Sequence, residues 1–483
     1  MTKITFFGGL NEIGGNKILI EDGDTRIFFD FGLSFSDYGK FFSEFLKPRK
    51  CNGIGDFLEF GLIPDLKGLY REDYLRHMGR KKEEKEFDGV FLSHAHLDHS
   101  GLIPYLREDL TIYSSEPTYF ILKAMDETNS GDLNEFTTIT ETFGTYINKK
   151  GLISRKNAKN SPEIKRERPY KIFEYGKKIK VDSIEILPFN VDHSLPGATG
   201  YIIYTSSGII VYTGDFRFHG RNGEKSKGFM EFCSREKPDV LIIEGTRVDE
   251  TERKDESDVE KGVIKNSSKK GLTVCNWPTR DIDRMISFFN ASRYLEKKLV
   301  INMRQAYLLN LLESCNDVEI PPLDEVEIYA QRKSWGLIGS DWDKKIINED
   351  YESWERELLE DSLCYKDIRA EQENYMFFCS NFDLKDLIDI KPSKDSVYIK
   401  SVCEPFDIEM EIDWNRIKNW IDHFGLELFK VHSSGHASGP ELKNFVKNVE
   451  PKYIFPIHTQ NYNQFHSWFK EKTKVFNVNS FDL

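Results

Sequence analysis

The sequence has no long apolar run and no closely spaced pair of cysteines. A membrane-spanning helix needs about 18 or more consecutive apolar residues, and no window of the chain approaches that length. The N-terminus also lacks the basic region, apolar run and small-residue cleavage site of a secretory signal. None of the seven cysteines forms a CxxC pair, so we expect reduced thiols. These absences argue against a membrane partner and predict a cytoplasmic protein.

An overall positive charge is also absent. The chain carries a formal net charge of −13, so its composition gives no sign of a polyanionic partner. Net charge averages over the whole surface, however, whereas binding uses local patches. Residues 149–180 contain twelve Lys or Arg and three Glu. We interpret this segment as a solvated basic loop, with a phosphate-facing surface as the open alternative.

Apolar patterns are plentiful and change along the chain. At 483 residues the chain exceeds the usual size of a single core. Short apolar runs such as KITFFG and GVFLSHAH predict strands up to about residue 245. A charged run at 249–260 marks a boundary, beyond which strand and helix patterns alternate, as in a doubly wound α/β domain. Strands ended by histidine return in LELFKVHSS and PKYIFPIHT. We therefore predict an α/β protein whose middle segment is inserted into the first domain, with the divisions 1–248, 249–425 and 426–483 and no separate C-terminal domain.

The densest cluster of chemically active side chains is HAHLDH, which directly follows the strand pattern GVFLS. It offers four potential metal ligands, His94, His96, Asp98 and His99. In an extended loop His94 and His96 point one way, and Asp98 with His99 can serve a neighbouring position. Imidazole suits zinc, and an adjacent carboxylate suits a second ion. The cluster therefore predicts a metal centre.

A centre with two ions needs further ligands. His193 in VDHSLPGAT and Asp215 in VYTGDF both follow strand patterns, and no histidine lies between His99 and His193. A carboxylate that bridges two ions is expected in such centres. These two residues are therefore the natural completions of the ligand set.

The order of these motifs resembles the metallo-β-lactamase superfamily. Asp30 at the end of RIFFD, HAHLDH, His193 and Asp215 look like its four sequence motifs. Glu244 in VLIIEGT, His436 in SSGHAS and His458 in IFPIHT look like the additional motifs of its β-CASP nucleases. The segments GGLNEIGGN, HSGLIPYL and HSSGHASGPEL are similar to the ribonuclease J branch. The resemblance implies an α/β fold, namely a metallo-β-lactamase αββα sandwich with an inserted doubly wound β-CASP domain.

The resemblance also implies a function. It predicts a zinc-dependent phosphodiesterase in which a hydroxide activated by two zinc ions hydrolyses RNA, with Mn²⁺ or Mg²⁺ as substitutes. The partner would be single-stranded RNA with a 5′ end, degraded 5′ to 3′ to 5′-phosphate products, with endonuclease cleavage as a second mode. A histidine at 458, where DNA-processing members tend to have valine, points to RNA. A DNA nuclease, a hydrolase of lactones, thioesters or cyclic phosphodiesters, and a homodimer stay open as alternatives.

Individual roles follow from the same resemblance. One ion would be held by His94, His96 and His193, and the other by Asp98, His99 and His458, with Asp215 bridging. Asp98 would also orient or deprotonate the nucleophile. Glu244 would accept a hydrogen bond from a metal ligand or from His436 and fix its tautomer. Asp30 would do the same for the HAHLDH loop, with a simple turn at the strand end as the open alternative. His436 would stabilise the phosphoryl oxygens or protonate the leaving group.

The stretch VHSSGHASG, residues 431–439, is also compatible with a serine nucleophile or a plain turn. No GxSxG pattern surrounds its serines, which disfavours the nucleophile. We interpret it as a phosphate cradle of His432, Ser433, Ser434, Gly435 and His436, with Ser438 and Glu441 capping the helix that follows.

Several other residues have weaker signals. Arg217 after TGDF is a candidate for contact with a phosphate, although surface arginines are common. Trp277 and Phe378 are candidates for base stacking, although core packing is the better default for any single aromatic residue. Segments 38–88 and 124–180 look longer than the resemblance leads us to expect, and their role stays open. No role is predicted for His77, His219, His423 and His466.

Overall fold

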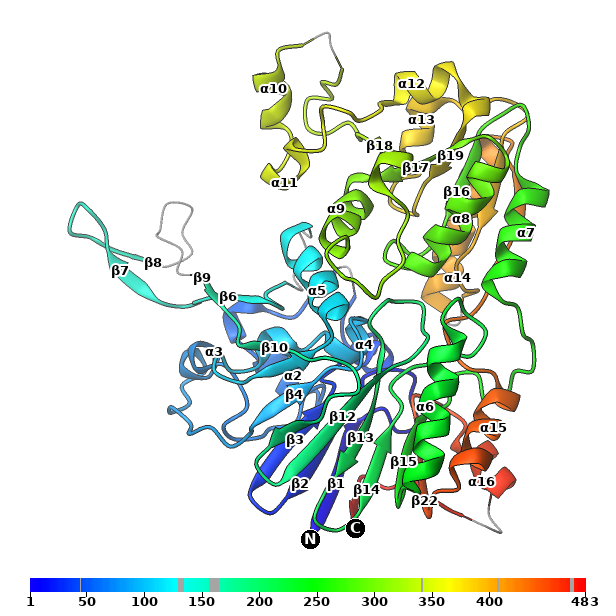
Figure 1. Cartoon of the computed structure of the whole chain (residues 1–483). Coiled ribbons are helices and arrows are strands. Elements are labelled where there is room, and N and C mark those ends of the chain that lie inside the picture. Colours follow the sequence, from blue (N-terminus) through cyan, green and yellow to red (C-terminus); the bar gives the residue numbers. More distant parts are fainter. Residues whose placement is uncertain (44, 129–133, 156–164, 340–341, 406–407, 470–472) are drawn as a thin grey trace.

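Two seven-stranded sheets pack face to face in the computed structural model (Figure 1). It describes all residues except 44, 129–133, 156–164, 340–341, 406–407 and 470–472. The first sheet has the order β10-β5-β4-β3-β2-β1-β24. Its strands are β1 (Thr2–Gly8), β2 (Lys17–Asp22), β3 (Thr25–Phe29), β4 (Gly89–Phe91), β5 (Ile112–Ser114), β10 (Tyr170–Ile172) and β24 (Ser480–Asp482).

The second sheet has the order β11-β12-β13-β14-β15-β22-β23. Its strands are β11 (Ile179–Val181), β12 (Ile184–Asn190), β13 (Thr199–Tyr204), β14 (Ile209–Tyr212), β15 (Val240–Glu244), β22 (Tyr453–Ile457) and β23 (Lys474–Val475). Alternation along β15 shows how the layers form, because successive side chains of a strand point to opposite faces. Val240 and Ile242 pack in the core between the two sheets, whereas Leu241 and Ile243 pack in the core beneath the outer helices.

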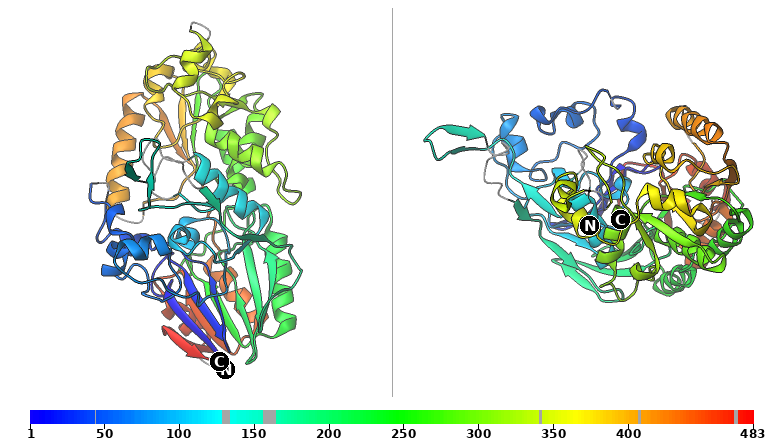
Figure 2. Two further views of the ribbon diagram at one scale, coloured as in Figure 1. Left: turned by 90° about the vertical axis from the view of Figure 1, so that its left-hand side faces the viewer. Right: turned by 90° about the horizontal axis from the view of Figure 1, so that it is seen from above.

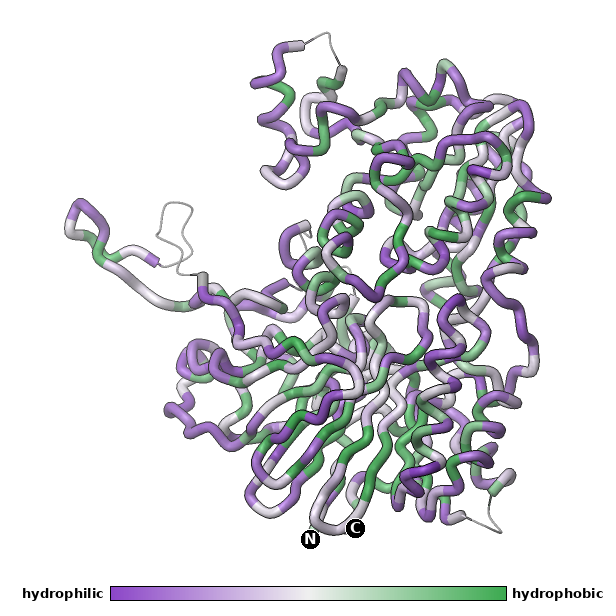
Figure 3. The backbone as a smooth tube through the Cα atoms, viewed as in Figure 1, coloured by the Kyte–Doolittle hydropathy of each residue, from purple (hydrophilic) through white to green (hydrophobic). Residues whose placement is uncertain are grey.

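Helices cover the outer faces of both sheets. Phe229 of α6 (Gly223–Glu236), Phe445 of α15 (Gly439–Val449) and Phe465 of α16 (Tyr462–Phe469) belong to the outer core of the second sheet. α5 (Glu116–Thr128) covers part of the first sheet, with Ile121 in its core. Figure 3 shows apolar colour concentrated along the strands between these layers. The predicted fold class, an αββα sandwich, is confirmed.

The inserted domain contains a six-stranded sheet in which every pairing is parallel, with the order β18-β17-β19-β16-β20-β21. Figure 2 shows this domain stacked on one end of the sandwich. Its strands are β16 (Thr273–Asn276), β17 (Lys298–Asn302), β18 (Glu327–Tyr329), β19 (Tyr375–Phe378), β20 (Val397–Lys400) and β21 (Glu427–Lys430). Its helices of eight or more residues are α7 (Glu256–Asn266), α8 (Ile282–Tyr294), α9 (Met303–Leu312) and α14 (Ile408–His423).

The inserted sheet extends past the expected boundary at residue 425. β21 pairs with β20 along its whole length, so residues 427–430 belong to the inserted domain. The pattern LELFKVHSS does not assign this strand, because a strand ended by histidine has the same sequence in either domain. We therefore propose that the insertion ends near residue 430.

Two small antiparallel strand pairs lie in and just before the basic segment. They are formed by β6 (Thr138–Thr140) with β9 (Lys165–Glu167), and by β7 (Thr145–Ile147) with β8 (Ile153–Arg155). The hairpin of β7 and β8 projects from the body of the molecule (Figure 1). Residues 156–164 of the basic segment lie outside the described residues.

The chain termini lie at one end of the sandwich, and the carboxyl ends of several central strands lie at the other. Both termini lie at the end remote from the inserted domain, where β24 pairs with β1 (Figure 1). The carboxyl ends of β3, β4, β14, β15 and β22 point toward the inserted domain. Loops that follow these strand ends are therefore gathered between the two domains.

Among the described residues, no helix is long and apolar enough to cross a membrane.

Candidate metal centre

The first cluster of ligands lies at the ends of β4, β12 and β14. Ligand atoms of His94, His96, His193 and Asp215 all lie within 4.8 Å of one another. His96 Nδ1 is 2.9 Å from His94 Nε2 and 3.2 Å from His193 Nε2. Three imidazole nitrogens converging on one point, with a carboxylate beside them, form a donor set that suits zinc.

The second cluster begins in α4 (Leu97–Ser100), a single helical turn that replaces the extended conformation we expected for this part of HAHLDH. Ligand atoms of Asp98, His99 and His458 lie within 4.8 Å of one another. Asp98 Oδ2 is 3.0 Å from His458 Nε2, although the two residues are 360 positions apart in the sequence. The fold thus brings His458 of IFPIHT into contact with the HAHLDH turn.

Asp215 connects the two clusters through one oxygen atom. Its Oδ2 lies 3.7 Å from His94 Nε2 in the first cluster, and 3.1 Å from His99 Nε2 and 3.6 Å from His458 Nε2 in the second. This position is the one that a carboxylate bridging two ions requires. The structure therefore brings all seven expected ligands together.

His436 and Glu244 lie next to this centre. His436 Nδ1 is 3.3 Å from Glu244 Oε1 and 3.8 Å from Asp215 Oδ2. Glu244 is fully buried, and its other carboxylate oxygen accepts a hydrogen bond from the backbone N–H of Thr246 at 3.0 Å. The side chain of His436 keeps 21% of its exposure and that of Asp98 19%, so both reach the solvent side of the centre.

Asp30 fixes the orientation of His99. The carboxylate is fully buried and accepts hydrogen bonds from the Ser93 backbone N–H, from Ser93 Oγ and from His99 Nδ1, each at 2.7 Å. It also accepts one from the hydroxyl of Tyr212 at 2.5 Å. With Nδ1–H engaged in this way, Nε2 of His99 faces the centre. The backbone of Asp30 is left-handed, with φ of 58°, which is unusual for a non-glycine residue.

His193 and His458 are oriented in the same manner. His193 Nδ1–H donates to the backbone carbonyl of Gly435 at 2.7 Å. His458 Nδ1–H donates to Thr246 Oγ1 at 2.8 Å, and that hydroxyl donates onward to the His458 carbonyl at 3.3 Å. Such partners select the tautomer that leaves Nε2 available for a metal ion.

Glycines at the N-terminal motif permit the close packing of α4. A Cβ on Gly32 would lie 1.7 Å from the carbonyl oxygen of Asp98, and one on Gly14 would lie 2.7 Å from the Asp98 side chain. Gly14 also has φ of +80°, which other residues rarely adopt. Gly14 of the GGLNEIGGN motif and Gly32 after β3 therefore let the backbone approach the metal-binding turn closely.

The electrostatics of the two clusters differ. Burial lowers the pKa of His96 to about 4, and burial together with neighbouring imidazoles lowers the pKa values of His94 and His193 well below the usual range. These rings are therefore neutral, as metal ligands must be. Burial also acts to lower the pKa of His99, but Asp215 and other nearby carboxylates raise it well above its usual value. The second cluster therefore attracts positive charge strongly.

The residues present fit a metal centre on further grounds. Within the described chain, His99 Nε2 and Asp215 Oδ1 are among the few buried side-chain atoms that have no hydrogen-bond partner. Buried polar atoms are normally satisfied, so atoms left over at the meeting point of seven ligands indicate a binding function. A metal ion accepting their lone pairs would satisfy them.

The loop 432–436 is oriented differently from the predicted cradle. Ser433 is buried, its hydroxyl donates to the Lys254 carbonyl at 2.6 Å, and its own carbonyl accepts from Arg284 at 2.7 Å. His432 Nδ1 lies 3.1 Å from the same guanidinium. Of the five predicted cradle residues, only His436 directs its side chain to the metal centre, while Gly435 contributes its carbonyl and Ser434 Oγ accepts from the His436 N–H at 3.2 Å.

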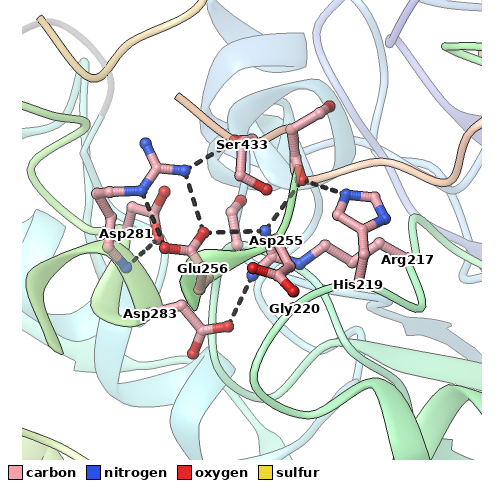
Figure 4. A network of polar contacts seen from close by, with 12 residues as sticks. Arg217, His219, Gly220, Asp255, Glu256, Asp281, Asp283 and Ser433 are labelled. Atoms are coloured by element: carbon pink, nitrogen blue, oxygen red, sulfur yellow. Dashed lines mark hydrogen bonds and ion pairs between the residues drawn. The ribbon is translucent and has the colours of Figure 1, made fainter. Parts of the chain in front are cut away.

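Arg217 is also placed differently from our expectation. The guanidinium is fully buried and pairs with carboxylates of Asp192, Glu256 and Asp283 (Figure 4). It is therefore not free to reach a phosphate. The predicted capping box of Ser438 and Glu441 is confirmed, with both of its hydrogen bonds present.

The aromatic candidates for base stacking are core residues. Trp277 is buried, stacks on Phe288 at a centroid distance of 4.5 Å and meets Phe378 edge to face at the same distance. Of the histidines without a predicted role, His219 is paired with Glu441 at 3.2 Å and with the Ser434 carbonyl at 3.1 Å. It supports the loop and faces no ligand.

The sequence did not reveal three supporting hydroxyls. Ser93, Tyr212 and Thr246 each orient a ligand or the carboxylate that holds one. A single Ser, Thr or Tyr has no distinctive spacing. The only available signals were that Ser93 directly precedes HAHLDH and that Thr246 follows Glu244 by two residues.

Comparisons with known proteins agree with this geometry. Residues 69–242 match the family described as "Metallo-beta-lactamase superfamily", and residues 425–478 match "Zn-dependent metallo-hydrolase RNA specificity domain". Ribonuclease J of Mycoplasma genitalium is 22% identical over 95% of this chain and 68% of that protein. Ribonuclease J of Pyrococcus abyssi is 22% identical over 95% of this chain and 90% of that protein.

A solved structure shares the fold. The crystal structure of a protein of unknown function from Enterococcus faecalis aligns over 100% of both chains with a TM-score of 0.71 and 23% sequence identity. The second matched segment, residues 425–478, contains both His436 and His458. With its sandwich fold, its ordered ligand motifs and these matches, the chain belongs to the metallo-β-lactamase superfamily and is a Zn-dependent metallo-hydrolase with an RNA specificity domain.

Proposed function

We propose that the protein is a ribonuclease that hydrolyses RNA phosphodiesters at a centre of two zinc ions. The observation that carries this proposal is the contact of His458 with Asp98 at 3.0 Å, because it joins the RNA specificity segment to the metal-binding turn. His94, His96 and His193 would hold one ion, and Asp98, His99 and His458 the other, with Asp215 between them. Mn²⁺ or Mg²⁺ are the expected substitutes.

The bound ions would supply a hydroxide nucleophile at neutral pH and would neutralise the phosphodiester. Asp98, which is partly exposed at the centre, orients the nucleophile through its carboxylate. His436 lies on the same exposed side and is paired with Glu244. Burial lowers the pKa of His436, but Glu244 and Asp215 outweigh this effect and raise it to about 9 before any metal binds. An imidazole N–H here is placed to stabilise the phosphoryl oxygens or to protonate the leaving oxygen.

The polarity of the reaction is part of the same proposal. By analogy with the relatives named Ribonuclease J, we propose 5′-to-3′ degradation of single-stranded RNA to 5′-phosphate products, with endonuclease cleavage as a second mode. A homodimer and a cytoplasmic location stay predictions.

Asp30 supports the centre by holding His99.

The test is a digestion of end-labelled RNA and of DNA of matched sequence by zinc-loaded wild type and by His436→Ala. We expect the wild type to release labelled 5′ mononucleotides from RNA, much less cleavage of DNA, and little activity in the variant. Preferential cleavage of DNA would support the DNA-nuclease alternative. Intact nucleic acid together with turnover of lactones, thioesters or cyclic phosphodiesters would replace the proposal with a small-molecule hydrolase.

A further inference from the structure

A second buried polar cluster contacts the loop 432–436, separate from the metal ligands. It joins Asp192 and Arg217 of the sandwich to Glu256, Asp283 and Arg284 of the inserted domain, and all five residues are buried. Figure 4 shows Glu256 at its centre, with Arg217, Asp283 and Ser433 around it. We call these five residues the interdomain cluster.

Arg284 is held at the start of α8 and uses its whole guanidinium. Nε and Nη2 donate to the two oxygens of Glu256, each at 3.1 Å. Nη1 donates to the carbonyl and hydroxyl oxygens of Ser401 at 2.8 and 2.7 Å. Nη2 also donates to the carbonyl of Ser433 at 2.7 Å, and Nη1 lies 3.1 Å from His432 Nδ1. This residue of the inserted domain therefore holds the backbone of the loop directly.

Arg217 holds the next carbonyl of the same loop. Its Nη1 donates to the Ser434 carbonyl at 3.0 Å, and its Nη2 donates to Asp283 at 2.7 Å. Its Nε lies 3.4 Å from Asp192, the residue that precedes His193. Both guanidiniums also contact the same oxygen of Glu256. The position of one guanidinium therefore depends on the other.

Three consecutive carbonyls of the loop accept hydrogen bonds from three different sources. Ser433 accepts from Arg284, Ser434 accepts from Arg217, and Gly435 accepts from the metal-facing His193. The next residue, His436, turns its side chain toward Asp215 and Glu244. A displacement of the first two carbonyls must therefore move the third carbonyl and the imidazole that follows it.

From this arrangement we infer that Arg284 and Arg217 are positioning residues, through which the inserted domain sets the place of His436 and the orientation of His193. The inference rests on the proposed function for its catalytic consequence, but its effect on metal binding does not depend on the substrate. A guanidinium is needed because Lys has no rigid fork and cannot reach Glu256, Ser401 and Ser433 together.

The matched control is Arg221, which joins the same two domains without touching the loop. Its side chain donates to Ser287 Oγ at 3.0 Å and to the Asp283 carbonyl at 3.4 Å, and it lies 3.3 Å from Glu260. A substitution there weakens the contact between the domains but leaves the carbonyls of 433 and 434 in place. The comparison therefore separates domain docking from loop positioning.

The experiment compares the full-length chain as wild type, Arg284→Ala, Arg284→Lys and Arg221→Ala. Zinc affinity is measured by competition with a chelator, and kcat and KM are measured on end-labelled RNA. We expect Arg284→Ala to weaken zinc binding about tenfold and to lower kcat about 30-fold with KM changed less than threefold, in keeping with the usual effect of groups that orient metal ligands. Arg221→Ala should change each value less than threefold.

Two further outcomes decide the inference. Free guanidinium ion should restore part of the activity of Arg284→Ala, because it refills the site between Glu256 and the Ser433 carbonyl, and Arg284→Lys should fold and show an intermediate loss. Equal losses in Arg221→Ala and Arg284→Ala, or unchanged zinc affinity in both Arg284 variants, would overturn the inference. If no variant or wild type cleaves RNA while the zinc affinities still differ as expected, only the proposed function fails.

Discussion

The metal centre and the interdomain cluster are both buried, charged and in contact with loop 432–436, yet they are completed in different ways. The metal centre leaves His99 Nε2 and Asp215 Oδ1 without a hydrogen-bond partner. In the part of the chain that the structure describes, no buried side-chain atom of Arg217, Glu256, Asp283 or Arg284 is left without one. The first cluster needs a ligand from outside the chain, whereas the second is satisfied within it.

The difference indicates two roles, since one cluster holds backbone segments in place and the other binds metal ions. Buried charges that are fully paired hold backbone segments in one arrangement, and removing one partner leaves the others uncompensated. Buried donors and acceptors that are not paired are available to a metal ion. Loop 432–436 lies where the two kinds of cluster meet, so it can transmit the position of the inserted domain to the metal ligands.

The largest effect is expected from Asp215→Asn. The substitution removes the charge of the carboxylate that lies between both ligand clusters, so RNA cleavage should fall by roughly 10³-fold or more and zinc content should fall with it. The matched change in the interdomain cluster is Asp283→Asn, which keeps an oxygen that accepts from Arg217 and should lower zinc content far less than Asp215→Asn does. Similar zinc content in the two variants would remove the distinction between the clusters.

His436→Ala should have the next largest effect. Loss of one group that stabilises the transition state typically lowers kcat by about 10²–10³-fold. Because we assign His436 to the substrate rather than to the ions, the zinc content measured by elemental analysis should stay that of the wild type. A variant that loses one equivalent of zinc would show that His436 is a ligand, as its nearness to Asp215 and His458 also permits.

Thr246→Val should weaken zinc binding by about 10–100-fold, the usual cost of losing a group that orients a metal ligand. The hydroxyl accepts the Nδ1–H of His458 and so selects its tautomer. Chelator competition measures the effect. Thr246→Ser keeps the hydroxyl and should bind zinc nearly as the wild type does, whereas equal weakening in both variants would point to lost methyl packing instead.

The metal-free protein should lose stability as the pH rises from about 7 to 9. Despite burial, Glu244 and Asp215 raise the folded-state pKa of His436 to about 9, above its ordinary value of 6.5. The stabilising contribution of this proton is fully present below pH 6.5 and is lost as the pH passes through 9. Thermal unfolding of wild type and His436→Gln at several pH values measures the difference, which should shrink toward pH 9. A difference that grows with pH would contradict this assignment.

The smallest effect is expected on the projecting hairpin. Lys149 and Lys150 lie exposed at its turn, remote in sequence from every metal ligand. Reversing both charges should weaken RNA binding about two- to tenfold and flatten its dependence on salt, with zinc content and kcat unchanged. Titrations of RNA at several salt concentrations test this. If the affinity of the variant depends on salt as that of the wild type does, the hairpin does not contact RNA.

The sequence predicted most of the ligand set because the chemistry of HAHLDH is dense and local, and the resemblance to the β-CASP nucleases added His458. HAHLDH places four donors in six residues, and His193, Asp215 and His458 each follow an apolar strand pattern. The structure places them all in one centre. The strand and helix patterns predicted an α/β protein with an inserted middle segment, whereas the αββα arrangement was implied by the resemblance of the motifs to the metallo-β-lactamase superfamily.

Burial and partners could not be predicted in the same way. Arg217 reads as a surface arginine after TGDF, but the fold covers it with carboxylates that come from three separate segments. Ser433 reads as a phosphate donor, but its hydroxyl is used by the backbone of Lys254. β21 reads as a strand of either domain, and only its pairing with β20 assigns it.

The central claim is that the two ligand clusters joined by Asp215 form the centre that cleaves RNA. It is tested most directly by measuring zinc content and cleavage of 5′-end-labelled RNA on the same samples of wild type and Asp215→Asn. We predict about two zinc ions per wild-type chain, with 5′ mononucleotides released, and loss of both zinc and cleavage in the variant. A wild type that binds zinc fully and leaves the RNA intact, or an Asp215→Asn variant that still cleaves it, would contradict the account.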